Sequence, residues 1–229
     1  MLFQQVNIKI MSEKTVAIIG ATGLVGNYLL ELLLNDNYFS TVRVVVRRPY
    51  QKTHPKMEVK LVDFDDAESL KLALEETNTI FCCIGTTNKK VKGDKELYRK
   101  IDLGIPVRTA RFGKEAGCEN YIIISAVGAN SKSNNFYLKL KGETEDALKS
   151  IGFRSLYIFR PSLLLGERKE FRSGEKIGTA VMRTISFLLP SKYKPVHGKE
   201  VAKAMLAAAK ENKEGVFVKE YKEIKRQPS

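Results

Sequence analysis

Three side chains in the second half of the sequence have the types and spacing of an acid–base set. Tyr137 and Lys141 are four residues apart, so a helix would place both on one face. The reference pKa of a tyrosine is about 10, and a neighbouring ammonium lowers it by stabilising the phenolate. Ser125, at the end of a predicted strand, could hydrogen-bond the same oxygen. Such a set could exchange a proton with an alcohol or a carbonyl; a solvated helix face is the alternative.

A glycine-rich segment, GATGLVG, follows the first predicted strand and opens the first predicted helix. Its first glycine would allow a tight turn, its second a close approach to a pyrophosphate, and its third close packing of helix on strand. The free N–H groups of the helix N-terminus favour the same anion. We therefore predict a dinucleotide site here, with packing of the turn alone as the alternative. The predicted contact residues are Gly20, Thr22, Gly23, Leu24, Val25 and Gly26.

The end of the second predicted strand bears on the choice of cofactor. Sites that prefer NAD tend to place an acidic residue here for the ribose 2′-hydroxyl, whereas arginine accommodates a 2′-phosphate. This strand is followed by Arg47 and Arg48, with no acid beside them. The sequence therefore favours NADP(H) over NAD(H). Two solvated arginines at a strand end are the alternative.

Strands and helices must alternate to position these residues. The predicted strands are Thr15–Ile19, Val42–Val46, Glu58–Val62, Thr79–Ile84, Tyr121–Ser125 and Ser155–Phe159. The predicted helices are Gly23–Leu34, Asp66–Leu74, Lys95–Glu115, Phe136–Ser150, Ile177–Leu188 and Lys199–Glu211. Most of the strands are almost continuously apolar, as expected where helices cover both faces of a parallel sheet. The order predicts an α/β fold with a doubly wound parallel sheet.

The chain length fits one domain. We predict an N-terminal extension over residues 1–13, within which Met11 is an alternative start, and a single domain over 14–218. A small substrate lobe or lid is predicted at about 161–198, where charges and glycines gather before an apolar helix. Residues 219–229 are predicted to be a charged, frayed tail.

The composition is basic, with 39 Lys and Arg against 26 Asp and Glu in 229 residues. Two segments carry much of the excess: 86–100 has six basic and two acidic residues, and 166–200 has eight and four. Both are predicted to flank the carboxyl ends of the strands, where a basic rim would attract a phosphorylated cofactor or an anionic substrate. Solvated lysines are the alternative.

Other classes of protein find little support in the sequence. It contains no zinc-finger spacing, recognition-helix cluster or basic tract interleaved with aromatics, which argues against sequence-specific nucleic-acid binding. The apolar runs are too short to span a bilayer. His54 and His197 are isolated, so no metal site is predicted. Three cysteines, two of them adjacent, suit reduced thiols and a cytoplasmic protein.

Several segments together resemble a known family over roughly residues 14–210. They are FCCIGTT from Phe81, SAVGAN from Ser125, SNNFYLKLKGE from Ser133 and FRPSLL from Phe159, beside a GxxGxxG loop whose spacing resembles the wider short-chain dehydrogenase/reductase superfamily. This set is similar to the Tat-interacting-protein branch of the atypical short-chain dehydrogenases/reductases. The resemblance implies a Rossmann fold and an NADPH-binding oxidoreductase.

The resemblance also implies site residues. Ser125, Tyr137 and Lys141 would be catalytic, and the last two would also contact the cofactor. Further cofactor contacts would come from Asp63, Phe64, Gly85, Thr86, Thr87, Arg160 and Pro161. Local roles are the alternatives: a turn or helix cap for Asp63, a strand-to-loop turn for Gly85 and a strand end for Pro161. This chain has Ala126 where the branch often has a second serine, which puts the role of Ser125 in question.

Three functions fit these features. The first is NADP(H)-dependent hydride transfer to or from a small carbonyl or alcohol substrate, either neutral or anionic, by a monomer or homodimer. The second is a non-catalytic NADPH-binding redox sensor or scaffold, suggested by the short substrate lobe. The third is a nucleoside-diphosphate-sugar epimerase-like enzyme with tightly held NAD, which Arg47 and Arg48 disfavour.

Overall fold

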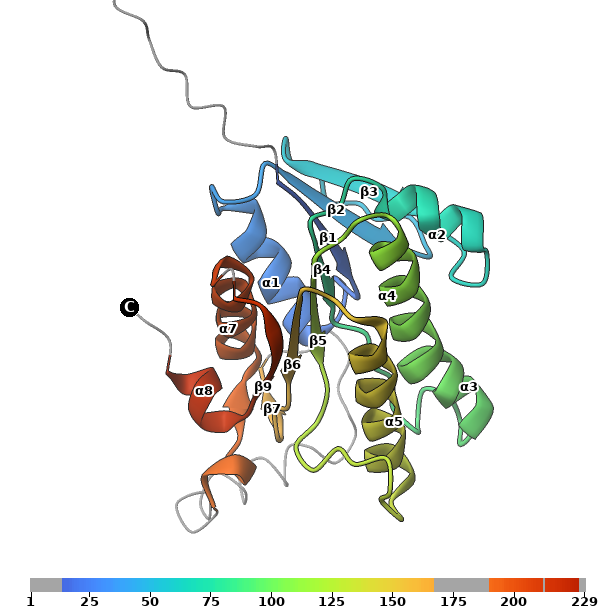
Figure 1. Ribbon diagram of the computed structural model, residues 1–229, viewed down its shortest axis with the longest axis vertical. Helices are drawn as coiled ribbons and strands as arrows, with labels where there is room; N and C mark the ends of the chain where they lie inside the picture. The colour runs from blue at the N-terminus through green and yellow to red at the C-terminus, as the bar shows by residue number, and fades with distance from the viewer. Residues whose placement is uncertain (1–13, 167–189, 212, 227–229) are drawn as a thin grey trace, which may run out of the picture.

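The computed structural model describes residues 14–166, 190–211 and 213–226. Within these residues a seven-stranded sheet has the order β3-β2-β1-β4-β5-β6-β9, and every neighbouring pair is parallel (Figure 1). The strands are β1 Thr15–Ile19, β2 Thr41–Val46, β3 Met57–Leu61, β4 Thr79–Cys82, β5 Asn120–Ile124, β6 Ser155–Phe159 and β9 Gly215–Lys219. Two short strands, β7 Leu164–Leu165 and β8 Val196–His197, form a separate parallel pair.

Helices cover both faces of the sheet (Figure 1). On one face lie α1 Leu24–Leu34 and α7 Gly198–Lys210, and on the other α2 Ala67–Leu74, α4 Ile105–Glu115 and α5 Phe136–Ile151. The short helix α3 Lys95–Arg99 continues through a π-helical turn, Lys100–Gly104, into α4. A 3-10 turn, Ser191–Tyr193, and a last helix, α8 Tyr221–Lys225, complete the described elements. The predicted doubly wound α/β fold is confirmed.

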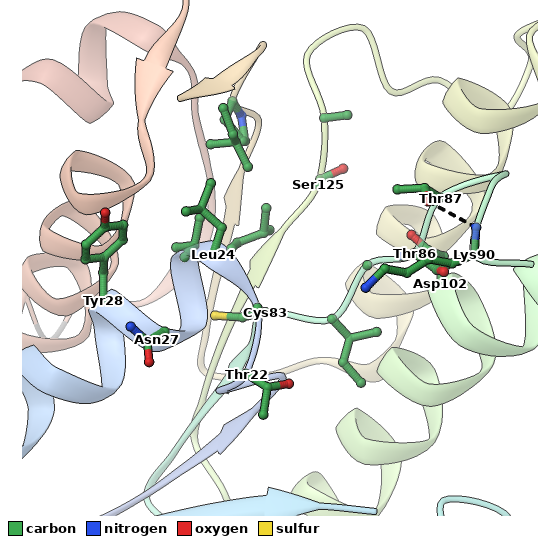
Figure 2. Close-up of a pocket in the computed structure, with 18 of the residues that line it drawn as sticks. Thr22, Leu24, Asn27, Tyr28, Cys83, Thr86, Thr87, Lys90, Asp102 and Ser125 are labelled. Atoms are coloured by element: carbon green, nitrogen blue, oxygen red, sulfur yellow. Dashed lines mark hydrogen bonds between the residues drawn. The ribbon is translucent and has the colours of Figure 1, made fainter. Parts of the chain in front are cut away.

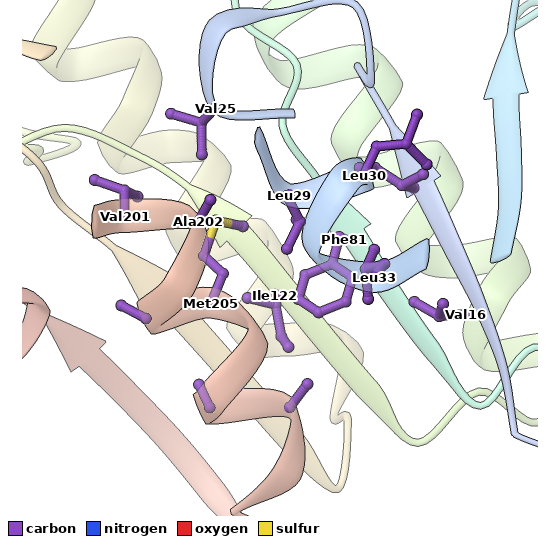
Figure 3. Packing of buried hydrophobic residues seen from close by; sticks show 14 of the residues in the cluster. Val16, Val25, Leu29, Leu30, Leu33, Phe81, Ile122, Val201, Ala202 and Met205 are labelled. Atoms are coloured by element: carbon purple, nitrogen blue, oxygen red, sulfur yellow. The ribbon is translucent and has the colours of Figure 1, made fainter. Parts of the chain in front are cut away.

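The two largest hydrophobic clusters among the described residues lie one on each face of the sheet. In β1, Val16 and Ile18 belong to the cluster under α1 and α7, whereas Ala17 and Ile19 belong to the cluster under α2, α4 and α5. Figure 3 shows the first cluster, in which leucines of α1 and Met205 of α7 meet over the sheet. Burial on both faces explains why the central strands are apolar at nearly every position.

The topology opens a crevice at one edge of the sheet. From β1 the chain moves outward to β2 and β3, then returns to place β4 on the other side of β1. The connections after β1 and β4 therefore diverge, and ligands of open α/β sheets bind at such a switch point, beyond the carboxyl ends of the strands.

The carboxyl end of the described chain differs from the prediction. Instead of a frayed tail beyond residue 218, β9 completes the sheet at its edge and α8 follows, with Ile224 fully buried. The helix begins in a capping box in which Glu220 and Glu223 each accept a backbone N–H of the other. Charged residues flank the short apolar run 216–218 of β9 and make up most of α8, so neither element stands out in the sequence pattern.

Parts of two predictions concern residues outside the described ranges. The helix predicted at Ile177–Leu188 lies there entirely, as does most of the lobe predicted at 161–198. The described ends of that lobe, 161–166 and 190–198, contain β7, β8 and the 3-10 turn. Among the described residues, no helix is long and apolar enough to cross a membrane.

Candidate functional site

A large cleft lies at the carboxyl edge of the sheet. Its volume is about 1730 Å³, beyond the roughly 300–1,000 Å³ of typical small-molecule sites. Segments that follow β1, β4, β5 and β6 line it, together with one face of α5. Figure 2 labels lining residues after β1, β4 and β5, among them Thr22, Thr86 and Ser125. The predicted site residues that line it are Thr22, Gly23, Leu24, Val25, Gly85, Thr86, Thr87, Ser125, Tyr137, Lys141 and Pro161. One cleft therefore contains most of the predicted cofactor residues and the predicted acid–base set.

The glycine loop is shaped by close backbone contacts. Gly20 has a φ of +86°, and a Cβ there would lie 2.7 Å from the carbonyl carbon of Cys83. A Cβ on Gly26 would lie 2.1 Å from the carbonyl oxygen of Gly20. These two glycines do not line the cleft, but they bring β1, β4 and the start of α1 together. Gly23, the N-cap of α1, supplies no side-chain cap, so N–H groups of the first turn are available to a ligand.

The acid–base pair is held by a buried aspartate. Helix α5 begins after Asn135, whose side chain accepts the N–H of Leu138, and it exposes Tyr137 by 38% while burying Lys141. The Lys141 ammonium lies 2.9 Å from Oδ1 of Asp102, which is 1% exposed. The backbone N–H of Thr86 donates to the other carboxylate oxygen, at 2.8 Å. Asp102 thus ties the loop after β4 to the lysine.

The charge state of Lys141 follows from these neighbours. Burial lowers its pKa, but the charges of Asp102 and Tyr137 and the contact with the Asp102 carboxylate raise it, and the net pKa lies above the usual value. Lys141 therefore remains an ammonium at neutral pH. A positive charge beside Tyr137 is the condition that the predicted proton exchange requires.

Replacing Asp102 with asparagine should lower the free energy of unfolding by about 1.5–3 kcal/mol, because the buried Lys141 ammonium loses a charged partner. Denaturant titration measures the change. Asp65→Asn is the matched control: Asp65 pairs with Lys100 of the π-turn and Arg108 of α4 at the surface, where ion pairs contribute little. Equal losses of unfolding free energy in both variants would show that the buried Asp102–Lys141 pair stabilises the fold no more than a surface ion pair does.

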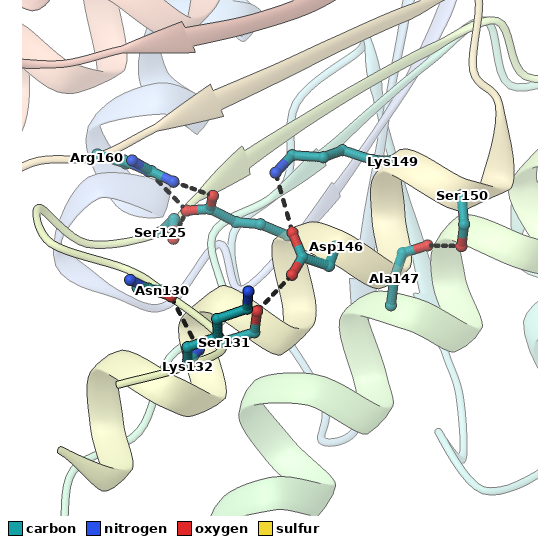
Figure 4. Close-up of polar contacts among 10 residues, drawn as sticks. Ser125, Asn130, Ser131, Lys132, Asp146, Ala147, Lys149, Ser150 and Arg160 are labelled. Carbon is teal, nitrogen blue, oxygen red and sulfur yellow. Dashed lines mark hydrogen bonds and ion pairs between the residues drawn. The ribbon is translucent and has the colours of Figure 1, made fainter. Parts of the chain in front are cut away.

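Ser125 is part of a second buried network (Figure 4). Its hydroxyl donates to Oε1 of Glu145 at 2.5 Å. Arg160 donates to both carboxylate oxygens of Glu145, from Nε at 2.9 Å and from a terminal nitrogen at 2.5 Å. The Glu145 side chain is almost fully buried. The network joins the end of β5, the end of β6 and the face of α5 that carries Lys141.

Besides Gly20 and Gly26, five predicted cofactor residues in the described part of the chain do not line the cleft. Arg47 and Arg48 are exposed beyond the end of β2, although Pro49, Tyr50 and Lys52 of the same loop do line it. The side chains of the other three make contacts within the protein. Asp63 accepts the N–H of Asp65 in a turn, Phe64 packs in the core beside α2, and Arg160 is paired with Glu145.

Asp102 and Glu145 were not predicted from the sequence. Glu145 follows Lys141 by four residues and so shares its helix face, which is a usable signal. Asp102 is an acid in the apolar stretch KIDLGIPV, where a solvated surface charge is not expected. In the described part of the chain, no group of three or more His, Cys, Asp or Glu could hold a metal ion.

Comparison with known proteins identifies the family. The family model described as NAD(P)H-binding matches residues 20–212. This chain belongs to the NAD(P)H-binding family. Among its relatives is "Protein FMP52, mitochondrial" of Debaryomyces hansenii, 37% identical over 204 residues that cover 85% of this chain and 87% of that one. Protein HTATIP2 of Rattus norvegicus is 33% identical over 168 residues, 72% of this chain and 69% of that one.

Solved structures share the fold of this NAD(P)H-binding protein. MoeE5 in complex with UDP-glucose and NAD aligns with a TM-score of 0.69 at 15% identity, over 92% of this chain and 79% of that one. The Bordetella bronchiseptica enzyme WbmH in complex with NAD+ aligns with a TM-score of 0.71 at 16% identity, over 91% and 76%. The predicted Rossmann-type fold and the predicted resemblance to the Tat-interacting-protein branch are confirmed.

Proposed function

We propose that this protein is an NADP(H)-dependent oxidoreductase that transfers a hydride to or from a small carbonyl or alcohol. One observation carries the proposal: the glycine loop and the Tyr137–Lys141 pair line the same cleft in an NAD(P)H-binding protein. The cleft is large enough for a dinucleotide and a second molecule, and its loop glycines and uncapped α1 N-terminus fit a pyrophosphate.

Each residue has a separate task in this proposal. The nicotinamide, when bound, supplies or accepts the hydride. Tyr137 gives a proton to the reacting oxygen during carbonyl reduction and takes it back during alcohol oxidation. The Lys141 ammonium stabilises the phenolate that forms when the proton leaves. Thr22, Gly23 and the first turn of α1 hold the phosphates.

The direct test is NADPH consumption by the purified chain with a panel of small aldehydes and ketones. The proposal expects steady turnover with at least one of them. NADPH binding without turnover of any probe would support the sensor or scaffold instead. Conversion of a UDP-sugar by protein that retains NAD through purification would support an epimerase, the class to which several structural neighbours belong.

The preference for NADP(H) rests on Arg47 and Arg48. Their guanidinium groups lie on the loop that continues into the cleft lining at Pro49 and Tyr50. Replacing both arginines with alanine should raise the Kd for NADPH about tenfold or more and leave the Kd for NADH almost unchanged, since NADH lacks the 2′-phosphate. Arg111→Ala, an exposed arginine on α4, controls for lost surface charge. Equal weakening of both cofactors would contradict the assignment.

An anionic substrate group would suit the lysines of the cleft. Lys52, Lys89 and Lys90 line it. The second predicted basic segment, 166–200, lies mostly outside the described residues. We propose that carboxylated aldehydes are reduced with a lower KM than their uncharged analogues, with the difference shrinking at high ionic strength.

We further propose that the protein is cytoplasmic and that it is a monomer or a homodimer. Cys82, Cys83 and Cys118 are all unpaired, which suits the reducing cytoplasm, while the name of the FMP52 relative includes the word mitochondrial. Cell fractionation separates the two locations. Light scattering separates a monomer from a homodimer.

A further inference from the structure

Ser125 lines the cleft, but its hydroxyl donates to Glu145, a residue that does not. A serine has one O–H donor, and Ser125 uses it toward Glu145 at 2.5 Å. Glu145 accepts two further bonds from the Arg160 guanidinium. A carboxylate so placed only accepts hydrogen bonds, which settles the polarity of the Ser125 contact. The hydroxyl could donate to a ligand only by giving up this short, buried bond.

Glu145 and Arg160 also connect the elements that support the site. Ser125 follows β5, Arg160 follows β6, and Glu145 lies on α5, one turn beyond Lys141. The backbone N–H of Ser125 donates to the carbonyl of Phe159, so the two strand ends are already joined. The carboxylate of Glu145 draws α5 against both, and it thereby sets the position of the helix face that presents Tyr137 and Lys141.

We propose that Ser125, Glu145 and Arg160 form a positioning clamp for α5, and that proton exchange at the reacting oxygen falls to Tyr137 without a donor from Ser125. This inference rests on the proposed function. It departs from the role implied for Ser125 by the resemblance, and it makes Glu145 and Arg160 positioning residues.

The chain contains a matched control one residue away. Asp146 also accepts a serine hydroxyl, from Ser131 at 2.7 Å, and also has a cationic neighbour, Lys149 at 3.1 Å (Figure 4). That pair lies at the surface of α5, whereas the Ser125 bond is buried. Asp146→Asn therefore tests whether any lost serine–carboxylate bond on α5 has the same effect.

The first measurement is the proton NMR spectrum, which needs no turnover. A hydroxyl proton held in a short, buried bond to a carboxylate exchanges slowly and resonates downfield. We expect such a signal in the wild-type chain and in Asp146→Asn, and its loss in Ser125→Ala. A wild-type spectrum without a signal that depends on Ser125 would overturn the clamp.

The second measurement is carbonyl reduction with NADPH, together with thermal unfolding of every variant. Ser125→Ala should lower kcat by no more than about threefold, because Tyr137 retains its proton and the two Arg160–Glu145 bonds still hold α5. Removal of an orienting donor costs about 10²-fold or more. Glu145→Gln, which keeps the shape and an acceptor oxygen, should lower kcat about tenfold with KM nearly unchanged. In a Tyr137→Phe background, Glu145→Gln should lower kcat by less than about a further twofold, because Glu145 acts through Tyr137.

The outcomes separate this inference from the proposed function. A 10²-fold loss of kcat in Ser125→Ala, with unfolding unchanged, would make Ser125 a donor to the substrate and overturn the proposal. Folded Glu145→Gln with full activity would reduce the clamp to a structural feature and overturn its positioning role. A wild-type chain that turns over no carbonyl would refute the proposed function and the positioning role together, and the hydroxyl signal would still decide whether Glu145 holds Ser125.

Discussion

Replacing Tyr137 with phenylalanine is expected to lower kcat for carbonyl reduction by about 10²–10⁴-fold and to leave NADPH binding nearly unchanged. The substitution removes one oxygen, and with it the proton that the proposal assigns to the reaction. Tyr137 is 38% exposed at the start of α5, and its ring faces Tyr98 at a centroid distance of 6.4 Å. Phenylalanine keeps that ring contact, so the fold and the cleft should remain intact.

Stopped-flow and steady-state rates with NADPH measure the effect of Tyr137→Phe on the reaction, and calorimetric Kd values measure its effect on NADPH binding. Tyr38→Phe is the control, because Tyr38 does not line the cleft and uses its ring in cation–π contacts with Lys14 and Lys210. A Tyr137→Phe protein that reduces carbonyls at the wild-type rate would show that the proton comes from another group.

Replacing Gly26 with alanine is expected to raise the Kd for NADPH at least about 100-fold and to lower the free energy of unfolding by about 3 kcal/mol. The added Cβ would lie 2.1 Å from the carbonyl oxygen of Gly20, a backbone atom with no rotamer to adjust. Helix α1 must therefore move away from the β1 turn. The N–H groups that would hold the pyrophosphate move with it.

Gly104→Ala is the control for this substitution. Gly104 has a helical backbone in the π-turn, and its added Cβ would have no neighbour nearer than 3.8 Å. That change should leave binding intact and stabilise the fold slightly, as alanine does in a helix. If Gly26→Ala folded and still bound NADPH at the wild-type affinity, the loop after β1 would not be the phosphate site.

The fold was predictable where the sequence pattern is local. The bounds of β1 and β6 agree with the prediction, because both strands are short apolar runs buried on both faces. Strand β9 was missed, since it lies at the sheet edge with Val216 and Val218 exposed and charged residues on both sides. The helix predicted at Lys95–Glu115 exists, but its π-turn at Lys100–Gly104 places Asp102 inward, toward partners that the helical period does not reveal.

The candidate site was predictable to the same extent. The loop glycines, and likewise Tyr137 and Lys141, are separated by only a few residues, so their spacing alone predicts a role. Asp102 and Glu145 were missed because their partners are far along the chain: Asp102 binds Thr86, 16 residues away, and Glu145 binds Ser125, 20 residues away. Tertiary packing brings those groups together: the π-turn meets the loop after β4 at Asp102, and α5 meets the end of β5 at Glu145.

Calorimetric titration of the purified chain with NADPH, NADP+, NADH and NAD+ shows directly whether the cleft binds NADP(H). We expect one site per chain that binds NADPH at least about tenfold more tightly than NADH, a difference of about 1.4 kcal/mol. Absence of binding by all four nucleotides, or tighter binding of NADH, would contradict this expectation.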